Sequence, residues 1–187
     1  MNSDVTVHIG SQKIEYVEPL RDESDWIGTL AETGALKPTG GRLVRAKRFL
    51  DGGTFLATYG DGLSNVYLSK LLAFHRAKGK VATITGVRPV TRFGELAVSA
   101  GIARESREKP QLDEGWVKDG FFVFEPKIFD YLTDDATLER EPLDRLTRDG
   151  QLAVHEHAGY WAAMDTFCET QLLNEEWASG TPGWLEP

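Results

Sequence analysis

The sequence contains little cysteine and no long apolar run. Cysteine occurs once among 187 residues, at Cys168, so no disulfide can form within the chain. Small secreted domains usually carry several cysteines, and we therefore expect a cytoplasmic protein. Residues 1–10 lack the basic and then apolar arrangement of a signal peptide, and no apolar run approaches the roughly 20 residues of a membrane-spanning helix. These absences argue against secretion and membrane insertion.

Basic side chains are also in short supply. The chain has 21 Lys and Arg against 29 Asp and Glu, which gives a formal net charge of −8. Proteins that bind nucleic acid gain affinity by releasing counterions with clustered positive charge, so we expect no nucleic-acid partner. The sequence also contains neither a Gly-x-Ser-x-Gly pattern nor a P-loop.

What is present fits one globular domain. With 187 residues and 41% hydrophobic content, the chain is long enough to bury its own core. Residues 1–38 predict a β-ribbon across Gly10-Ser11, followed by an irregular connection with a short strand at 26–30. Residues 39–187 predict an α/β core that ends in a helix.

Within that core, apolar residues recur with helical spacing and with strand spacing in turn. Thr39 is a candidate N-cap for a first helix, residues 54–59 and 81–87 predict buried strands, and residues 66–77 predict a helix between them. This strand, helix, strand unit favours a parallel sheet. Further along the chain we expect a hairpin at 93–106, a strand at 121–124, helices at 126–132 and 142–148, a strand at 152–155 and a helix at 164–177.

The first candidate for chemistry is Asp61, in Gly60-Asp61-Gly62 just after a predicted strand. Ligands of open α/β sheets bind outside the carboxyl ends of the strands, which favours a ligand-binding role. The alternative is a turn aspartate that satisfies local backbone groups, and this pattern is common in turns.

A second carboxylate, Asp165, precedes the last predicted helix. The alternative for Asp165 is a helix N-cap. If Asp61 and Asp165 met, they could hold Mg²⁺ against substrate phosphates, because this cation favours one or two carboxylates together with phosphate oxygens.

Other polar residues are weaker candidates. Lys109 could bind a phosphate and Glu108 a sugar hydroxyl, or both could belong to a solvated charge cluster. Arg42, behind Gly40-Gly41, could meet an anion at a helix N-terminus. His155 and His157 share a strand face without a third ligand marked by spacing, and Cys168 suits a buried thiol.

Several segments, taken in order, resemble glucose-1-phosphate cytidylyltransferase, a family of the sugar-nucleotidyltransferase superfamily. The resemblance runs from about Asp4 to Trp184 and rests on Thr39-Gly40-Gly41-Arg42-Leu43, Tyr59-Gly60-Asp61-Gly62, Arg92-Phe93-Gly94, Glu108-Lys109-Pro110, Gly120-Phe121-Phe122-Val123, Glu139-Arg140-Glu141-Pro142-Leu143 and Met164-Asp165-Thr166. It implies a three-layer α/β fold with a mostly parallel, mixed sheet of the Rossmann-like type, truncated at its N-terminal edge.

The resemblance also implies a reaction, in which CTP and glucose 1-phosphate give CDP-glucose and pyrophosphate with Mg²⁺. The product of this family feeds deoxysugar synthesis for surface polysaccharides such as O-antigen. By this likeness Asp61 and Asp165 are the catalytic, metal-binding pair. The implied substrate-binding residues are Arg42, Tyr59, Glu108, Lys109 and Lys118.

Two departures from the family pattern shape the functional expectation. This sequence contains no Gly-Gly-x-Gly-Thr-Arg loop, which cradles the nucleotide triphosphate in the family, and Lys118 and Asp119 stand where the family has Asn and Gly. We expect weak or absent activity of this chain alone, because each phosphate-directed amide or cation is worth a few kcal/mol in the transition state. The alternatives are a non-catalytic binding or assembly subunit, as a homo-oligomer or with a full-length homologue, and a truncated gene product.

Overall fold

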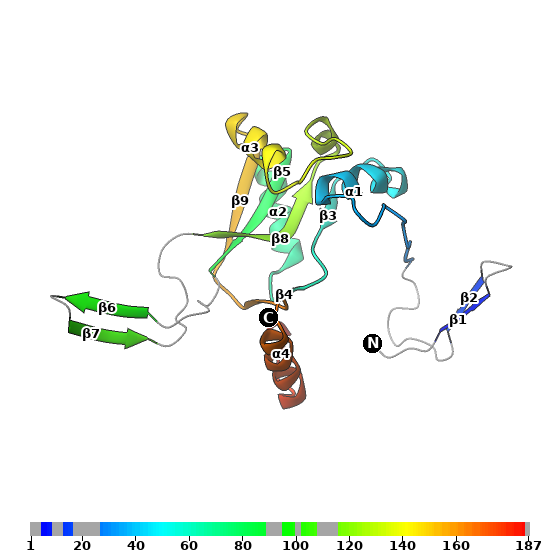
Figure 1. The fold of residues 1–187 in the computed structure, drawn as a ribbon. Helices are drawn as coiled ribbons and strands as arrows, with labels where there is room; N and C mark the ends of the chain where they lie inside the picture. The colour runs from blue at the N-terminus through cyan, green and yellow to red at the C-terminus, as the bar shows by residue number, and fades with distance from the viewer. Residues whose placement is uncertain are drawn as a thin grey trace. The chain divides into compact units, whose positions relative to one another are not determined.

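A computed structural model describes residues 5–8, 13–16, 27–88, 95–99, 102–107 and 116–185 (Figure 1). The chain divides into two compact units, Met1–Glu32 and Thr33–Pro187. Among the described residues, the helices lack the length and the apolar character of a membrane-spanning segment.

The first unit contains the expected ribbon. Strands β1 (Val5–His8) and β2 (Lys13–Tyr16) pair antiparallel, with Val5 opposite Tyr16. The short strand predicted at 26–30 is wrong for residues 27–30, which form no regular structure. Ile27 and Leu30 are almost fully exposed there, so burial does not favour an extended strand. Trp26 lies outside the described residues.

The second unit is built on a four-stranded mixed sheet with the order β3-β8-β5-β9. Its strands are β3 (Phe55–Ala57), β8 (Val117–Phe124), β5 (Ala82–Val87) and β9 (Leu152–His157). Strand β8 is antiparallel to both β3 and β5, whereas β9 is parallel to β5. Three of these four strands therefore run in one direction, which confirms the mostly parallel, mixed sheet.

The order of the strands differs from a simple strand, helix, strand unit. Helix α2 (Leu68–Lys78) lies between β3 and β5 in the sequence, as predicted, but β8 separates these two strands in the sheet. Every residue of β5 is buried, as expected for a central strand. Strand β3 is shorter than predicted, and Leu56 is partly exposed because β3 lies at the end of the described sheet.

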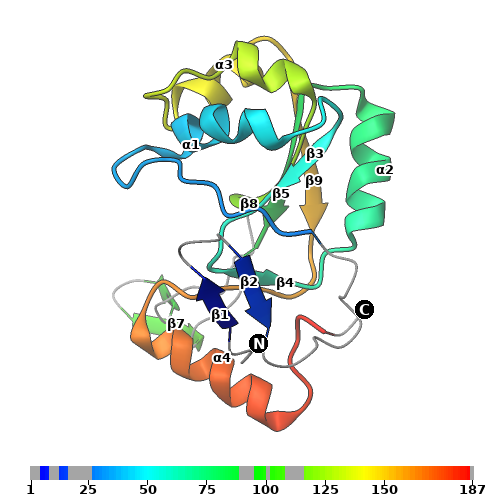
Figure 2. The same ribbon diagram turned by 90° about the vertical axis from the view of Figure 1, so that its right-hand side faces the viewer.

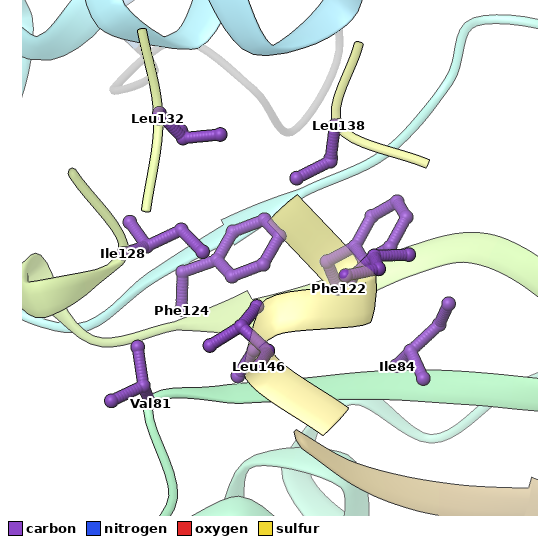
Figure 3. Packing of buried hydrophobic residues seen from close by; sticks show 10 residues of the cluster. Val81, Ile84, Phe122, Phe124, Ile128, Leu132, Leu138 and Leu146 are labelled. Carbon is purple, nitrogen blue, oxygen red and sulfur yellow. The ribbon is translucent and has the colours of Figure 1, made fainter. Parts of the chain in front are cut away.

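Helices cover both faces of the sheet, which confirms three layers (Figure 2). On one face lie α1 (Thr39–Ala46), the 3₁₀ helix η2 (Pro126–Asp130) and α3 (Glu141–Arg148), and on the other lies α2. A 3₁₀ helix η1 (Lys47–Phe49) continues α1. The core under α1 and α3 joins Ile84, Phe122 and Phe124 of the sheet to Ile128 and Leu146 (Figure 3).

Two smaller strand pairs complete the described structure. Strands β6 (Glu95–Ser99) and β7 (Ile102–Arg107) form the predicted hairpin. Strands β4 (Gly62–Ser64) and β10 (Trp161–Ala163) pair antiparallel, and α4 (Phe167–Ser179) follows β10. The predicted buried thiol is wrong, because Cys168 is exposed on α4, which buries only Leu173.

Candidate functional site

The carboxyl ends of β3, β5 and β9 lie at one edge of the sheet, because these three strands run in the same direction. The chain leaves β3 toward Asp61, leaves β5 at Arg88 and leaves β9 at His157. Ligands of such sheets bind at this edge. We therefore take it as the candidate site.

Strands β4 and β10 bring the two predicted carboxylates to this edge together. Gly62 lies opposite Ala163, and the Met164 amide donates a hydrogen bond to the Asp61 carbonyl at 2.9 Å. Asp165 is the next residue. The structure thus places Asp61 and Asp165 on neighbouring backbone segments.

The structure also tests the alternative roles of these two residues. The Asp61 carboxylate accepts no hydrogen bond from the part of the chain that the structure describes, so it does not support its own turn. Asp165 is not the N-cap of α4, because Thr166 is: its hydroxyl accepts from the Glu169 amide at 3.3 Å in a capping box. Both side chains are exposed at the edge.

Arg42 stabilises the segment before α1 and also lines a cavity. Its guanidinium donates to the carbonyls of Lys37 and Ala35 and to the Thr33 hydroxyl, at 2.9 to 3.1 Å, and so holds the segment before α1. A cavity of about 240 Å³ lies alongside, and its mostly apolar wall includes Arg42, Tyr59, Leu43, Ala57 and Phe122. The structure thus brings Arg42 and Tyr59 to one hollow.

The glycines before Arg42 are explained by packing. A Cβ on Gly40 or Gly41 would overlap the backbone of the segment 134–136, and the Gly41 amide donates to the Ala136 carbonyl at 3.2 Å. Thr39 is the first residue of α1 rather than its N-cap, which is Pro38. The Thr39 hydroxyl instead donates to Glu139 at 2.7 Å.

Basic side chains near α1 form ion pairs with acidic residues. Hydrogen bonds from Arg45 and then Lys37 lower the pKa of Asp134 to about 2. Arg45 meets this carboxylate at 2.8 Å, and Lys37 also contacts Asp135 at 2.7 Å. These cations therefore secure the loop before α3.

Lys118 lies on β8, near the start of the strand and so at the same edge. Its amine donates to the Glu139 carbonyl at 2.6 Å. Glu108 and Lys109 lie outside the described residues, as does the side chain of Asp119, and the predicted roles of Glu108 and Lys109 stay predictions.

His155 and His157 lie near the carboxyl end of β9, at the same edge. In the described residues, no group of three or more His, Cys, Asp or Glu side chains could together hold a metal ion. His157 approaches Asn65 Oδ1 at 3.0 Å through Nε2, and His155 lies edge-on to Phe74. Burial, and then the nearby His157, lowers the pKa of His155.

Two residues at this edge were missed by the sequence analysis. Arg88 follows β5, and its guanidinium lies 4.6 Å from the centre of the Trp116 ring. The rule that selected Asp61, a polar residue after a buried strand, would also have selected Arg88. Glu139 contacts Tyr59, Thr39 and Lys118, a convergence that spacing does not reveal.

Comparison with known proteins identifies a matching family and similar proteins from other organisms. The nucleotidyl transferase family matches residues 11–166. A glucose-1-phosphate cytidylyltransferase of Salmonella typhi is 40% identical over 188 residues, covering 97% of this chain and 71% of the relative. A protein of Bacillus subtilis (strain 168), described as a probable glucose-1-phosphate cytidylyltransferase, is 43% identical over 170 residues, covering 90% and 66%. The chain thus spans about two thirds of the length of these relatives.

Solved structures share the fold at lower identity. HddC from Yersinia pseudotuberculosis superposes with a TM-score of 0.57 at 20% identity, over 75% of this chain and 62% of that one. With a sequence match over most of its length, the chain belongs to the nucleotidyl transferase family, among relatives of the glucose-1-phosphate cytidylyltransferases.

Proposed function

We propose that this chain serves Mg²⁺-dependent cytidylyl transfer, in which CTP and glucose 1-phosphate give CDP-glucose and pyrophosphate. The observation that carries the proposal is the placement of Asp61 and Asp165 on neighbouring backbone segments at the carboxyl edge of the sheet, in a chain similar to cytidylyltransferases. In this reaction an oxygen of glucose 1-phosphate attacks the α-phosphorus of CTP. The bond from that phosphorus to the bridging oxygen breaks, and pyrophosphate leaves with the electron pair.

The two carboxylates suit a magnesium ion. Mg²⁺ is usually held by one or two carboxylates, with substrate phosphates and water as its other ligands, so a two-carboxylate donor set is sufficient. Bound there, the cation would neutralise phosphate charge during transfer. Asp61 and Asp165 would hold it, and the pairing of β4 with β10 would keep the two backbones together.

The remaining predicted residues would bind the substrates. We propose that Glu108 and Lys109 hold the sugar phosphate, and that Arg42, Tyr59 and Lys118 bind around it. The cavity beside Arg42 and Tyr59 supports this for two of the five. Lys118 is already close to the Glu139 carbonyl, so it would act from a fixed position.

We make a separate proposal about the rate of this transfer. Because this sequence contains no Gly-Gly-x-Gly-Thr-Arg segment, we propose that the 187-residue polypeptide transfers weakly or not at all. Pyrophosphate release and ³¹P spectra with glucose 1-phosphate, Mg²⁺ and each of CTP, UTP, GTP and dTTP test both points. We expect at most slow product formation, from CTP, that the D165N variant abolishes. Robust turnover would overturn the claim of weak activity, and preference for another nucleotide or full activity of D165N would overturn the proposed reaction.

A second candidate function is assembly with a further subunit. Helix α4 exposes Phe167, Leu172 and Trp177 and buries only Leu173, so it presents apolar surface. We propose a homo-oligomer or a complex with a full-length homologue. Sedimentation of the chain alone and of its mixture with that homologue tests this, and a stable monomer that ignores the homologue would contradict it.

We further propose that the protein works in the cytoplasm and feeds nucleotide-sugar synthesis for surface polysaccharides such as O-antigen. The lone cysteine supports the location, and the similarity to cytidylyltransferases supports the role. The net charge of −8 supports the absence of a nucleic-acid partner.

A further inference from the structure

Glu139 lies where four segments of the chain meet. It precedes α3, and its carboxylate accepts one hydrogen bond from the Tyr59 hydroxyl and another, at 2.7 Å, from the Thr39 hydroxyl. Its backbone carbonyl accepts the Lys118 amine at 2.6 Å. The contacts come from the turn after β3, from the start of α1 and from β8.

Both carboxylate oxygens are engaged, which fixes the side chain in one orientation. The Thr39 hydroxyl completes the arrangement, because it also accepts a hydrogen bond from the Leu138 amide at 3.0 Å. Thr39 thus ties both Glu139 and the residue before it to α1. All of these groups are at least partly shielded from solvent.

Packing also restrains the ring of Tyr59. It lies edge-on to Phe122, at 5.8 Å between ring centres and 85° between planes. It also lies against Gly120, where a Cβ would overlap the ring. Packing therefore restrains the ring along its faces and edge, and the hydrogen bond to Glu139 holds its hydroxyl end.

We propose that Glu139 is a positioning residue of the substrate site. It holds Tyr59 and Lys118, two residues predicted to bind substrate, and through Tyr59 it fixes the backbone that leads to Asp61. This inference rests on the proposed function and deepens it, because it assigns to the same site a residue that touches neither the metal nor the substrate.

The role is separable from folding. The apolar core of the second unit consists of buried side chains on β5, β8, η2 and α3 and in the segments beside them, including Leu138, and it does not include the Glu139 carboxylate. Water can replace hydrogen bonds at a partly exposed carboxylate, so we expect a small loss of stability on its removal. Loss of orientation at Tyr59 would instead reduce the affinity for substrate, whereas Lys118 would keep its partner, the Glu139 backbone carbonyl.

Variants of both partners test this, with glucose 1-phosphate and Mg²⁺ as the probe in calorimetric titrations. We expect E139A to weaken binding about tenfold and E139Q less, because glutamine keeps one acceptor oxygen. The double variant E139Q/Y59F should bind no more weakly than the worse single variant, since both remove one interaction. The matched control is E141Q, because Glu141 is an exposed carboxylate two residues away that faces Arg145. This variant should bind like the wild type.

Hydrogen exchange separates this inference from the proposed function. We expect faster amide exchange at Gly60 and Asp61 in E139A than in E141Q, at similar melting temperatures. If the wild type binds glucose 1-phosphate and both E139A and E139Q bind it with the same affinity, the positioning role is overturned. If the wild type fails to bind glucose 1-phosphate, the proposed function fails, and exchange decides the rest: faster exchange in E139A supports a role in fixing the Asp61 backbone, and unchanged exchange overturns it.

Discussion

The amide of Met164 donates a hydrogen bond to the carbonyl of Asp61 at 2.9 Å, joining two segments far apart in the sequence. This bond continues the ladder between β4 and β10, in which Gly62 lies opposite Ala163. Asp165 follows Met164 directly, so the ladder places two carboxylates on adjacent backbones. The proposed metal site would therefore depend on the ladder as much as on the carboxylates.

The first prediction concerns these carboxylates. Replacing Asp61 or Asp165 by Asn removes a charged ligand, and we expect the affinity for Mn²⁺, used as a paramagnetic substitute for Mg²⁺, to fall about tenfold or more. Electron paramagnetic resonance of free Mn²⁺ measures this. D130N is the control, because Asp130 is exposed on η2, which follows the carboxyl end of β8 and so lies toward the opposite edge of the sheet. Equal losses in all three variants would contradict a specific site.

The second prediction concerns the cap of α4. The Thr166 hydroxyl accepts from the Glu169 amide, and the Glu169 carboxylate accepts from the Thr166 amide at 2.8 Å. Removal of such a cap costs about 1 kcal/mol, so T166A should unfold at a lower urea concentration by about that free energy. T170A is matched, because the Thr170 hydroxyl bonds to a helix carbonyl and caps nothing. If T166A and T170A were equally stable, the cap would have no energetic role.

The third prediction concerns Gly120. An alanine there would overlap the ring of Tyr59, so either the ring or β8 must shift. We expect G120A to lower the free energy of unfolding by roughly 1–3 kcal/mol, as for other overpacked sites. G60A is the control, since a Cβ on Gly60 meets open space. The cost should shrink in the double variant G120A/Y59A, and an unchanged cost would show that the ring is not the obstacle.

The fourth prediction concerns stability in acid. A hydrogen bond from Thr54 at 2.8 Å, and then His75 at 3.0 Å, lower the pKa of Glu125 below its usual value. A carboxyl whose pKa is lower in the folded state stabilises the fold above its unfolded pKa, about 4.3, and loses this contribution as the pH falls through the folded value. Urea unfolding from pH 7 to pH 3 should therefore show a shallower acid loss in E125Q.

The partner variants sharpen this test. T54V removes the first cause of the lowered pKa of Glu125 and should also flatten the acid loss, though less than E125Q. T58V is the control, because the Thr58 hydroxyl bonds to the Tyr59 carbonyl and not to Glu125. Identical pH profiles in the wild type and E125Q would rule out the contribution of Glu125.

The periodicity of apolar residues predicted where the strands and helices lie in the sequence more successfully than which strands pair in the sheet. Strand β5 was predicted from its apolar, β-branched residues, and its burial on both faces explains why the signal was clear. Nothing local reveals that β8 inserts between β3 and β5, because strand order depends on long-range pairing. Residues 27–30 resembled a strand but are exposed, which composition alone cannot show.

The residues of the candidate site also differ in how far the sequence could predict their roles. Asp61 could be selected from its position after a strand, whereas its approach to Asp165 required the pairing of β4 with β10. Gly40 and Gly41 suggested an anion site, yet their lack of side chains is explained by contact with the segment 134–136. Glu139 could not be assigned a role from the sequence, because its partners Tyr59, Thr39 and Lys118 come from separate elements.

We propose that the edge carrying Asp61 and Asp165 is a metal-dependent site for a sugar phosphate. Calorimetric titration of glucose 1-phosphate into the chain, in Mg²⁺ and again in excess EDTA, tests this proposal. We expect binding in Mg²⁺ that weakens at least about tenfold in EDTA and in the D61N variant, with competition from CDP-glucose. Absence of binding in Mg²⁺, or binding that neither EDTA nor D61N changes, would contradict it.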